Sequence, residues 1–250
     1  MTATLGIIGS GNIGSAVARL AVAAGWNVVL SNSRDAESLA DLVDELGPAA
    51  RAATSEEAAR AGDLVVAAVP LFAYDRLPAA ALADKTVIDP MVYYPDRDGR
   101  IAELDAGTLT SSELVQRHLA GSRVVKTFSN IDFRRLFTLA RAAGATDRSA
   151  LAVAGDDEAA KLQVVGLLDA LGYDAVDIGT LADGWRNGPN TPVHVQPYLP
   201  AWPQDLRTDE ERGRWFFETP GVPVPAARVK ELIDAAVPVP AGGMAPGARQ

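Results

Sequence analysis

Three glycines near the N-terminus have the spacing of a phosphate-binding turn. Gly9, Gly11 and Gly14 form a G-x-G-x-x-G pattern between the apolar run Thr4 to Ile8 and a segment with apolar residues at helical spacing. In such a turn the first glycine allows a tight bend, the second lets a pyrophosphate approach the backbone, and the third lets the helix pack closely. The helix N-terminus offers unpaired N–H groups to the phosphate. The residues expected to contact a dinucleotide here are Gly9, Ser10, Gly11, Asn12, Ile13 and Gly14.

The end of the next apolar run indicates which dinucleotide binds. Asn27 to Leu30 is followed by Ser31-Asn32-Ser33-Arg34, with no carboxylate at the end of the strand. Proteins specific for NAD usually place Asp or Glu there to bind the ribose 2′-hydroxyl. Hydroxyls and a guanidinium suit a 2′-phosphate, because Arg donates two parallel charge-assisted hydrogen bonds. We therefore expect NADP(H), held by Asn32, Ser33 and Arg34, with the side chain of Asp35 pointing elsewhere.

Composition excludes several other classes of function. The chain has 250 residues, no Cys and a formal net charge of −9. Without Cys there is neither a disulfide framework nor a thiolate nucleophile, and we expect a cytoplasmic protein. The negative charge argues against binding to nucleic acid or an anionic membrane, and no apolar stretch has the length of a membrane span. Because the two histidines, His118 and His194, lie far apart in the sequence, we expect no metal site.

Alternating strand and helix patterns predict the elements that position these residues. The expected strands are 4–8, 27–30, 51–54, 63–69, 85–89, 123–128, 150–154 and 175–178, and the expected helices between them include 35–46, 111–119 and 157–171. This alternation predicts an α/β fold, a Rossmann-type doubly wound and mostly parallel sheet with helices on both faces. We expect an NADP-binding domain over residues 1–184 that includes a smaller C-terminal βαβ part.

Residues 185–250 have a different composition and are expected to form a C-terminal arm. Eleven of the sixteen Pro and three of the four Trp follow Gly184. We expect helices near 205–217 and 226–236, and disorder over 238–250. Its aromatic residues either attach the arm to the core or form a lid or a subunit interface, and we weigh these interpretations equally. The aromatic residues concerned are Trp202, Trp215, Phe216 and Phe217.

Together with the glycine turn, two further segments carry a family resemblance. With the Asn32-Ser33-Arg34 ending and the run Val124-Val125-Lys126-Thr127-Phe128-Ser129-Asn130, residues 4–184 resemble the NADPH-dependent coenzyme F420 reductases. The resemblance implies hydride transfer between NADP(H) and the deazaflavin F420. It implies that Ser33 and Arg34 hold the 2′-phosphate, that the loop Val69-Pro70-Leu71 lies along the nicotinamide ribose, and that the strand end at 128–131 lines the space beside the nicotinamide. We also expect a homodimer.

Two departures from the family pattern fall where the acceptor would meet the nicotinamide. Pro90-Met91-Val92 replaces small polar residues, and Ser129 stands where relatives tend to have Asn or His. Met91, Ser129 and Asn130 are therefore the expected pocket residues, in a site that is more apolar than those of relatives. The cofactor assignment does not depend on these positions, whereas the identity of the acceptor does.

The acceptor decides whether the site needs a proton donor. A deazaflavin needs little acid–base help, whereas a carbonyl or imine compound must receive a proton with the hydride. Candidate donors near the C-terminal ends of strands are Tyr93, Tyr94, Asp89 and Lys126. Each also has a structural interpretation: the tyrosines pack before Pro95, Asp89 completes a turn, and Lys126 extends from an edge or pairs with a carboxylate.

Three functions remain open at this point. The first is an NADPH-dependent oxidoreductase that transfers a hydride to an F420-type deazaflavin. The second keeps NADPH but reduces the imine or carbonyl group of a small biosynthetic compound. The third is a non-catalytic redox sensor that binds NADP(H). In the first two the partner is a small-molecule acceptor.

Overall fold

Short apolar runs form the strands of one sheet in the computed structural model, which describes residues 2–238. The strands are β1 (Thr4–Ile8), β2 (Asn27–Ser31), β3 (Ala50–Ala52), β4 (Leu64–Ala67), β5 (Thr86–Asp89), β6 (Arg123–Lys126), β7 (Ala150–Gly155) and β8 (Asp174–Asp177). The helices are α1 (Asn12–Ala23), α2 (Ala40–Leu46), α3 (Ser55–Ala61), α4 (Ala79–Leu82), α5 (Pro95–Asp98), α6 (Ala102–Asp105), α7 (Ser111–His118), α8 (Phe133–Thr138), α9 (Glu158–Leu171), α10 (Asp209–Glu218) and α11 (Ala226–Asp234). Short 3₁₀ helices span Ala36–Leu39, Gly47–Ala49, Leu71–Arg76, Leu181–Asn187 and Gln196–Tyr198.

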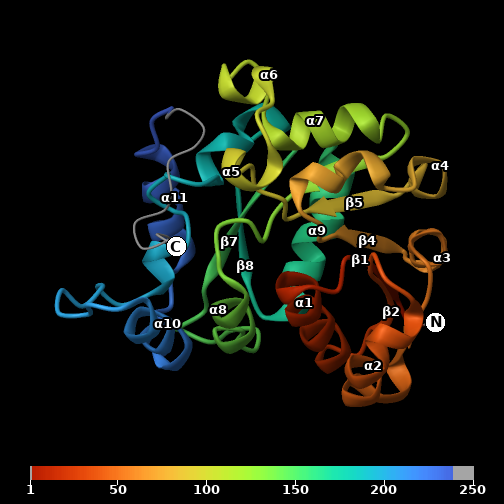
Figure 1. Cartoon of the computed structure of the whole chain (residues 1–250), viewed down its shortest axis with the longest axis horizontal. Coiled ribbons are helices and arrows are strands. Elements are labelled where there is room, and N and C mark those ends of the chain that lie inside the picture. Colours follow the sequence, from red (N-terminus) through yellow and green to blue (C-terminus); the bar gives the residue numbers. More distant parts are fainter. Residues whose placement is uncertain (1, 239–250) are drawn as a thin grey trace.

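The strand order confirms the predicted fold class. It is β3-β2-β1-β4-β5-β6-β7-β8, and the pairs are parallel except for β6 with β7 (Figure 1). The chain winds outward from β1 in both directions, so the switch point of the sheet lies between β1 and β4. Ligands of open α/β sheets bind at the carboxyl ends of the strands beside such a point.

Both faces of the sheet are covered by helices, which explains why the central strands are continuously apolar. Val125 of β6 packs in the cluster that contains residues of α1, α8, α9 and α11. Its neighbour Val124 packs in the opposite cluster, which contains residues of α3, α4, α6 and α7. Since successive side chains of a strand alternate between faces, Lys126 points to the same face as Val124, toward α7.

Strand β6 ends earlier than the sequence pattern predicts. The expected strand reaches Phe128, whereas β6 stops at Lys126 and the backbone of Phe128 has a φ of 62°. A non-glycine residue in the left-handed region cannot continue a strand, and its conformation costs energy that the surrounding packing must offset. The break turns the following Ser129 and Asn130 away from the line of the sheet.

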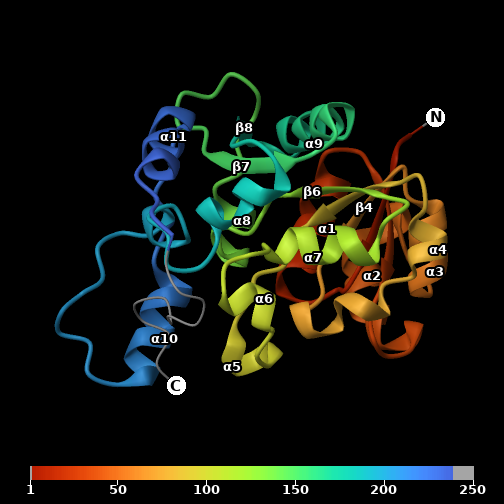
Figure 2. The same cartoon turned by 90° about the horizontal axis from the view of Figure 1, so that it is seen from above.

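One helix of the arm after Gly184, α11, belongs to the hydrophobic core. Val229 and Ile233 of α11 are buried in the cluster on the α1 side of the sheet, and α11 packs on β7 and β8. By contrast, none of the residues of α10 is buried. Both views place α10 and α11 at the end of the molecule farthest from α2 and α3 (Figures 1 and 2). Because α11 completes the core of the preceding part of the chain, the domain boundary that we place at residue 184 is a proposal.

The predicted disorder near the C-terminus and the predicted lack of a membrane span concern different parts of the chain. Disorder was expected over 238–250, and all of these residues except Pro238 lie outside the described part of the chain. Within residues 2–238, no helix is long and apolar enough to cross a membrane.

Candidate functional site

The glycine turn joins β1 to α1 with contacts that only glycine permits. Gly9 has a φ of 98°, and a Cβ on it would lie 2.3 Å from the carbonyl oxygen of Ala68. A Cβ on Gly14 would lie 2.0 Å from the carbonyl oxygen of Gly9. Such distances are far inside van der Waals contact, so both positions require glycine for the helix and the strands to pack.

Gly11 differs from the other two because nothing fills the space beside it. A Cβ on Gly11 would find no atom within 4 Å, and both Gly11 and Asn12 are exposed. Gly11 is the N-cap of α1, and no side chain caps the helix. The first N–H groups of α1 therefore point into an open cradle, where the helix dipole favours an anion. This cradle fits a dinucleotide pyrophosphate.

The end of β2 lies directly beside this turn. Ile8 and Ser31 are register partners, and the N–H of Gly9 donates to the carbonyl of Ser31 at 2.9 Å. The Ser10 hydroxyl donates to the same carbonyl at 3.0 Å. These bonds hold the glycine turn against the residues predicted to select the dinucleotide.

Asn32, Ser33 and Arg34 then leave the sheet toward solvent. The Asn32 side chain accepts from the Arg34 N–H at 2.9 Å and donates to the Ser38 hydroxyl at 2.8 Å, so it shapes the loop. Ser33 and Arg34 are exposed. The Asp35 carboxylate accepts from the Ser38 N–H at 3.0 Å, and among residues 2–238 Arg34 forms no ion pair. An exposed guanidinium without a carboxylate partner is able to bind a phosphate.

The three predicted residues of the loop after β4 differ in their exposure to solvent. Pro70 is exposed and Val69 is half-buried, while the Leu71 side chain is completely buried in the core. Only the backbone of Leu71 is therefore available to a ligand at this edge.

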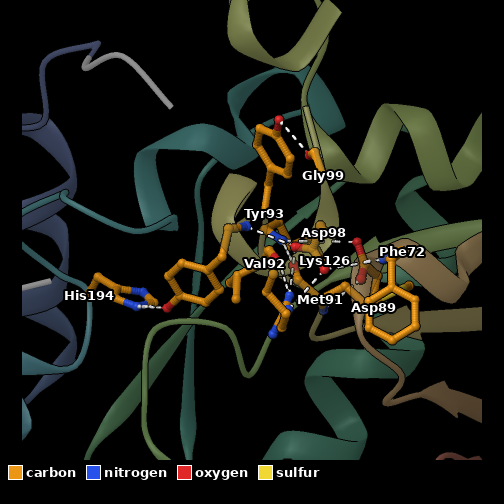
Figure 3. A network of polar contacts seen from close by, with 11 residues as sticks. Phe72, Asp89, Met91, Val92, Tyr93, Asp98, Gly99, Lys126 and His194 are labelled. Atoms are coloured by element: carbon orange, nitrogen blue, oxygen red, sulfur yellow. Dashed lines mark hydrogen bonds and ion pairs between the residues drawn. The ribbon is translucent and has the colours of Figure 1, made fainter. Parts of the chain in front are cut away.

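The ends of β5 and β6 carry a buried pair of opposite charges. Asp89 and Lys126 are register partners, with Oδ2 and Nζ 3.9 Å apart (Figure 3). The Asp89 carboxylate accepts from the Met91 N–H at 2.7 Å and from the Ser112 hydroxyl at 2.6 Å. Lys126 Nζ donates to the Met91 carbonyl at 2.8 Å. Burial lowers the pKa of Lys126, and the Asp89 charge opposes that shift. The pair thus fixes the backbone of Met91.

The two tyrosines that follow differ in their partners. The Tyr93 hydroxyl contacts the Gly99 carbonyl, the Asp105 carboxylate at 2.9 Å and the Ile101 N–H at 2.9 Å, so its bonding capacity is filled. The Tyr94 hydroxyl lies 3.3 Å from Nε2 of His194, a residue that follows it by 100 positions. Figure 3 shows His194 approaching this network from the arm.

The three predicted pocket residues are buried. Met91, Ser129 and Asn130 are 3%, 5% and 0% exposed, so their side chains pack inside the protein at the edge of the sheet. Ser129 donates to the Asn187 side chain at 2.5 Å, and Asn130 donates to the Tyr198 hydroxyl at 2.7 Å. Both partners belong to the arm, which therefore packs against the end of β6.

A cavity of about 350 Å³ lies on the α7 side of this edge. Of the predicted residues only Tyr93 and Lys126 line it, together with Val92, Glu113 and Trp185. Its volume is at the lower end of the range for small-molecule pockets. The structure does not bring Tyr94, Ser129 or the glycine turn into the lining of this cavity.

Sequence reasoning did not identify His194 and Asn187 as site residues. Both lie in a Pro-rich segment without strand or helix periodicity, and their partners are distant in the sequence. The one available signal was the rarity of histidine, because the chain has two. Within the described residues, no three His, Asp or Glu side chains gather as a metal site would require.

Comparisons with known proteins place this site in context. Residues 4–93, from β1 to Tyr93, match the family described as NADP oxidoreductase, coenzyme F420-dependent. A solved hypothetical protein from Sinorhizobium meliloti is 30% identical with a TM-score of 0.68, and the match covers 78% of this chain and 93% of that one. A proposed F420-dependent NADP reductase from Arthrobacter sp. FB24 is 26% identical with a TM-score of 0.62, covering 74% and 87%.

More distant structures share the fold alone. A reductive aminase from Aspergillus terreus in complex with NADPH and ethyl levulinate is 22% identical with a TM-score of 0.51. That match covers 73% of this chain and 56% of the aminase. Among curated proteins, none matches this sequence.

Substitution of Gly11 tests the open cradle. In Gly11→Val the branched side chain should occupy the space for the pyrophosphate without meeting any protein atom, so NADPH binding should be lost while the protein stays folded. Nicotinamide fluorescence and thermal unfolding measure the two effects. Gly14→Val is the matched control, because its side chain clashes with the turn itself and should destabilise the fold. Full NADPH affinity in a folded Gly11→Val protein would contradict the assignment.

Proposed function

The chain belongs to the family of coenzyme F420-dependent NADP oxidoreductases, and we propose that it transfers a hydride between NADPH and an F420-type deazaflavin. The family makes it an NADP(H)-dependent oxidoreductase. The deazaflavin is the proposed part, supported by the family description and by the name of the Arthrobacter protein. We infer the position of each group from the geometry of the turn and of the strand ends.

The open N-terminus of α1 beside the end of β2 is the observation that carries the proposal. It supports a pyrophosphate over Gly11 and a 2′-phosphate at Ser33 and Arg34. From there a dinucleotide crosses the carboxyl edge of the sheet toward β4 and β5. Pro70 and Val69 lie along that edge and are proposed to border the nicotinamide ribose.

At the nicotinamide end the protein orients the reactants. When bound, the dinucleotide supplies the hydride. The buried Asp89 and Lys126 hold the backbone of Met91, and the break at Phe128 sets the position of Ser129. These residues provide a rigid floor for the acceptor, and rigid placement of two reactants is a large part of the acceleration that enzymes achieve.

We also propose that the protein works as a cytoplasmic homodimer. Helix α10 carries Trp215, Phe216 and Phe217, yet buries none of them fully. Trp202 contacts Trp215 edge to face with ring centroids 4.4 Å apart, and Phe133 contacts both phenylalanines. A helix of ten residues gains most of its stability from packing, so a second copy is the proposed cover for this aromatic cluster.

Removal of Arg34 tests the choice of dinucleotide. Arg34→Ala should weaken NADPH binding by about 1.5–3 kcal/mol, the range for hydrogen bonds to charged groups, and leave NADH binding nearly unchanged. Arg34→Lys should recover part of the loss, because an ammonium lacks the planar fork. Arg60→Ala is the control, because the Arg60 side chain lies on the exposed face of α3. Equal losses for NADPH and NADH in a titration would show that Arg34 does not read the 2′-phosphate.

Turnover with F420 tests the acceptor. The wild-type protein should oxidise NADPH in the presence of F420 with one F420 reduced for each NADPH consumed, and Gly11→Val should not. Absorbance of both compounds follows the reaction. If NADPH binds but F420 stays oxidised, the dinucleotide site stands and the deazaflavin assignment is wrong.

Light scattering tests the dimer. The wild-type protein should have twice the mass of one chain, and Phe217→Glu should shift the population to monomers, because a carboxylate would be buried in the interface. The control is Leu162→Glu on α9, where the side chain is 71% exposed. A monomeric wild-type protein would refute the proposal.

A further inference from the structure

The contact between Tyr94 and His194 joins the loop after β5 to the arm, two segments that are 100 positions apart in the sequence. Tyr94 follows β5 and is half-buried, while His194 belongs to the arm and is 8% exposed. The phenol oxygen and Nε2 are 3.3 Å apart. Both residues lie at the carboxyl end of the sheet, where the acceptor of an α/β oxidoreductase is bound.

The surroundings of His194 indicate which ring nitrogen carries the proton. Nδ1 is buried and has no hydrogen-bond partner among the described residues. A proton there would be a buried donor without an acceptor, which costs more than an unfilled lone pair on the ring. The backbone groups of Asn187 and Ser129, which favour the protonated ring, form no hydrogen bond with Nδ1 in the structure. We therefore assign the proton to Nε2, from which it points to the Tyr94 oxygen. In that arrangement the contact with His194 does not use the hydroxyl proton of Tyr94.

Backbone strain surrounds the same contact. Val195, directly after His194, has a φ of 59°, and Phe128 has a φ of 62°. Left-handed conformations are unfavourable for these side chains, above all for a β-branched valine. The N–H of Val195 donates to the carbonyl of Asn130 at 2.8 Å, which ties the two strained segments together. Such strain persists where packing over-determines a conformation, and it is concentrated at functional sites.

The charged groups around the pair keep both members neutral near pH 7. Burial lowers the pKa of His194 to about 4, backbone groups of Asn187 and Ser129 oppose this, and the Lys126 charge adds to it. Burial also raises the pKa of Tyr94, with Arg97 opposing and Asp98 adding to the shift. These groups come from β6 and the turn that follows it, from α5 and from the arm. Tyr94 is thus a protonated phenol, and His194 is an uncharged donor to its oxygen.

We propose that the acceptor site has a second activity, the reduction of the carbonyl or imine group of a small molecule, in which Tyr94 is the proton donor and His194 is its positioning residue. This inference rests on the proposed hydride transfer from NADPH. The hydride adds to the carbon of the C=O or C=N group, and the π electrons move to the oxygen or nitrogen. The Tyr94 O–H bond breaks, its proton passes to that atom, and the electron pair stays on the phenol oxygen. Solvent then returns a proton to half-buried Tyr94.

The other candidate donors are less suited to this role. The Tyr93 hydroxyl already has three partners. Asp89 and Lys126 are buried and hold Met91 from behind the edge of the sheet. Of the four residues singled out in the sequence, Tyr94 alone combines partial exposure with a neutral hydrogen-bonding partner.

Histidine NMR tests the pair without cofactor or substrate. In the ¹⁵N-labelled apoprotein, His194 should show the tautomer protonated on Nε2 and should stay uncharged down to a pH of about 4. Tyr94→Phe should shift the His194 signals and leave those of His118, the internal control, unchanged. A His194 protonated on Nδ1, or one that titrates near the ordinary value of about 6.5, would overturn the positioning role.

Kinetics test the proton transfer, with ethyl pyruvate as the ketone and 1-pyrroline as the imine. The wild-type protein should oxidise NADPH with at least one of them, and Tyr94→Phe should lower kcat by about 10²- to 10⁴-fold, the usual contribution of a general acid. The KM for NADPH should not change. His194→Gln, whose amide can donate to the phenol, should retain more activity than His194→Met. Tyr74→Phe is the control, because the Tyr74 hydroxyl is not part of the pair.

The outcomes separate this inference from the proposed function. If the wild-type protein binds NADPH but reduces neither probe, or if Tyr94→Phe keeps the full rate, the inference is wrong and the dinucleotide site stands. If NADPH does not bind to the wild-type protein, the proposed function itself is wrong.

Discussion

The structure depends on the close contact between the first helix and the two strands that flank it. Gly14 of α1 lies so near Gly9 that a Cβ would overlap the backbone, and Gly9 in turn lies against Ala68 after β4. This packing brings the N-terminus of α1 to the switch point of the sheet and leaves Gly11 facing open space. The same residues that let the core close therefore create the anion site, so fold and dinucleotide binding share one constraint.

A second constraint sets the acceptor end of the site. Asp89 and Lys126 pair across neighbouring strands and both contact the backbone of Met91. Burying two charges is costly, and their pairing offsets only part of that cost. What the pair provides is a fixed start for the loop that carries Tyr94, the residue that meets His194 from the arm. The arm thus completes the core through α11 and supplies side chains to the site.

The sequence predicted those features that depend on local pattern. Glycine spacing, apolar strands and the Ser33-Arg34 ending depend on neighbours in the chain, and each lies where it was expected. The same holds for the doubly wound, mostly parallel sheet, because strands that alternate with helices are connected by parallel crossovers. The extent of β6 was overestimated, because the pattern of Arg123 to Phe128 predicts a strand, whereas packing forces Phe128 into the left-handed region.

Features that depend on distant contacts were beyond local pattern. Met91 and Ser129 are at the expected strand ends, yet both are buried: Met91 packs in the core cluster on the α7 side, and Ser129 donates to Asn187 of the arm. Tyr93 and Tyr94 are adjacent and alike, so only the structure distinguishes the filled hydroxyl from the one beside His194. His194 itself has no periodicity to reveal it, because its role arises from a contact over 100 positions.

Phosphorus NMR of bound NADP⁺ tests the central claim most directly, because it reports separately on the pyrophosphate and the 2′-phosphate. The structure predicts that both pyrophosphate signals and the 2′-phosphate signal shift on binding. It also predicts that the 2′-phosphate becomes a stronger acid, since the Arg34 guanidinium favours its dianion. Unchanged pyrophosphate signals would contradict the role of the open α1 terminus. A 2′-phosphate that titrates as it does in free NADP⁺ would contradict the role of Arg34.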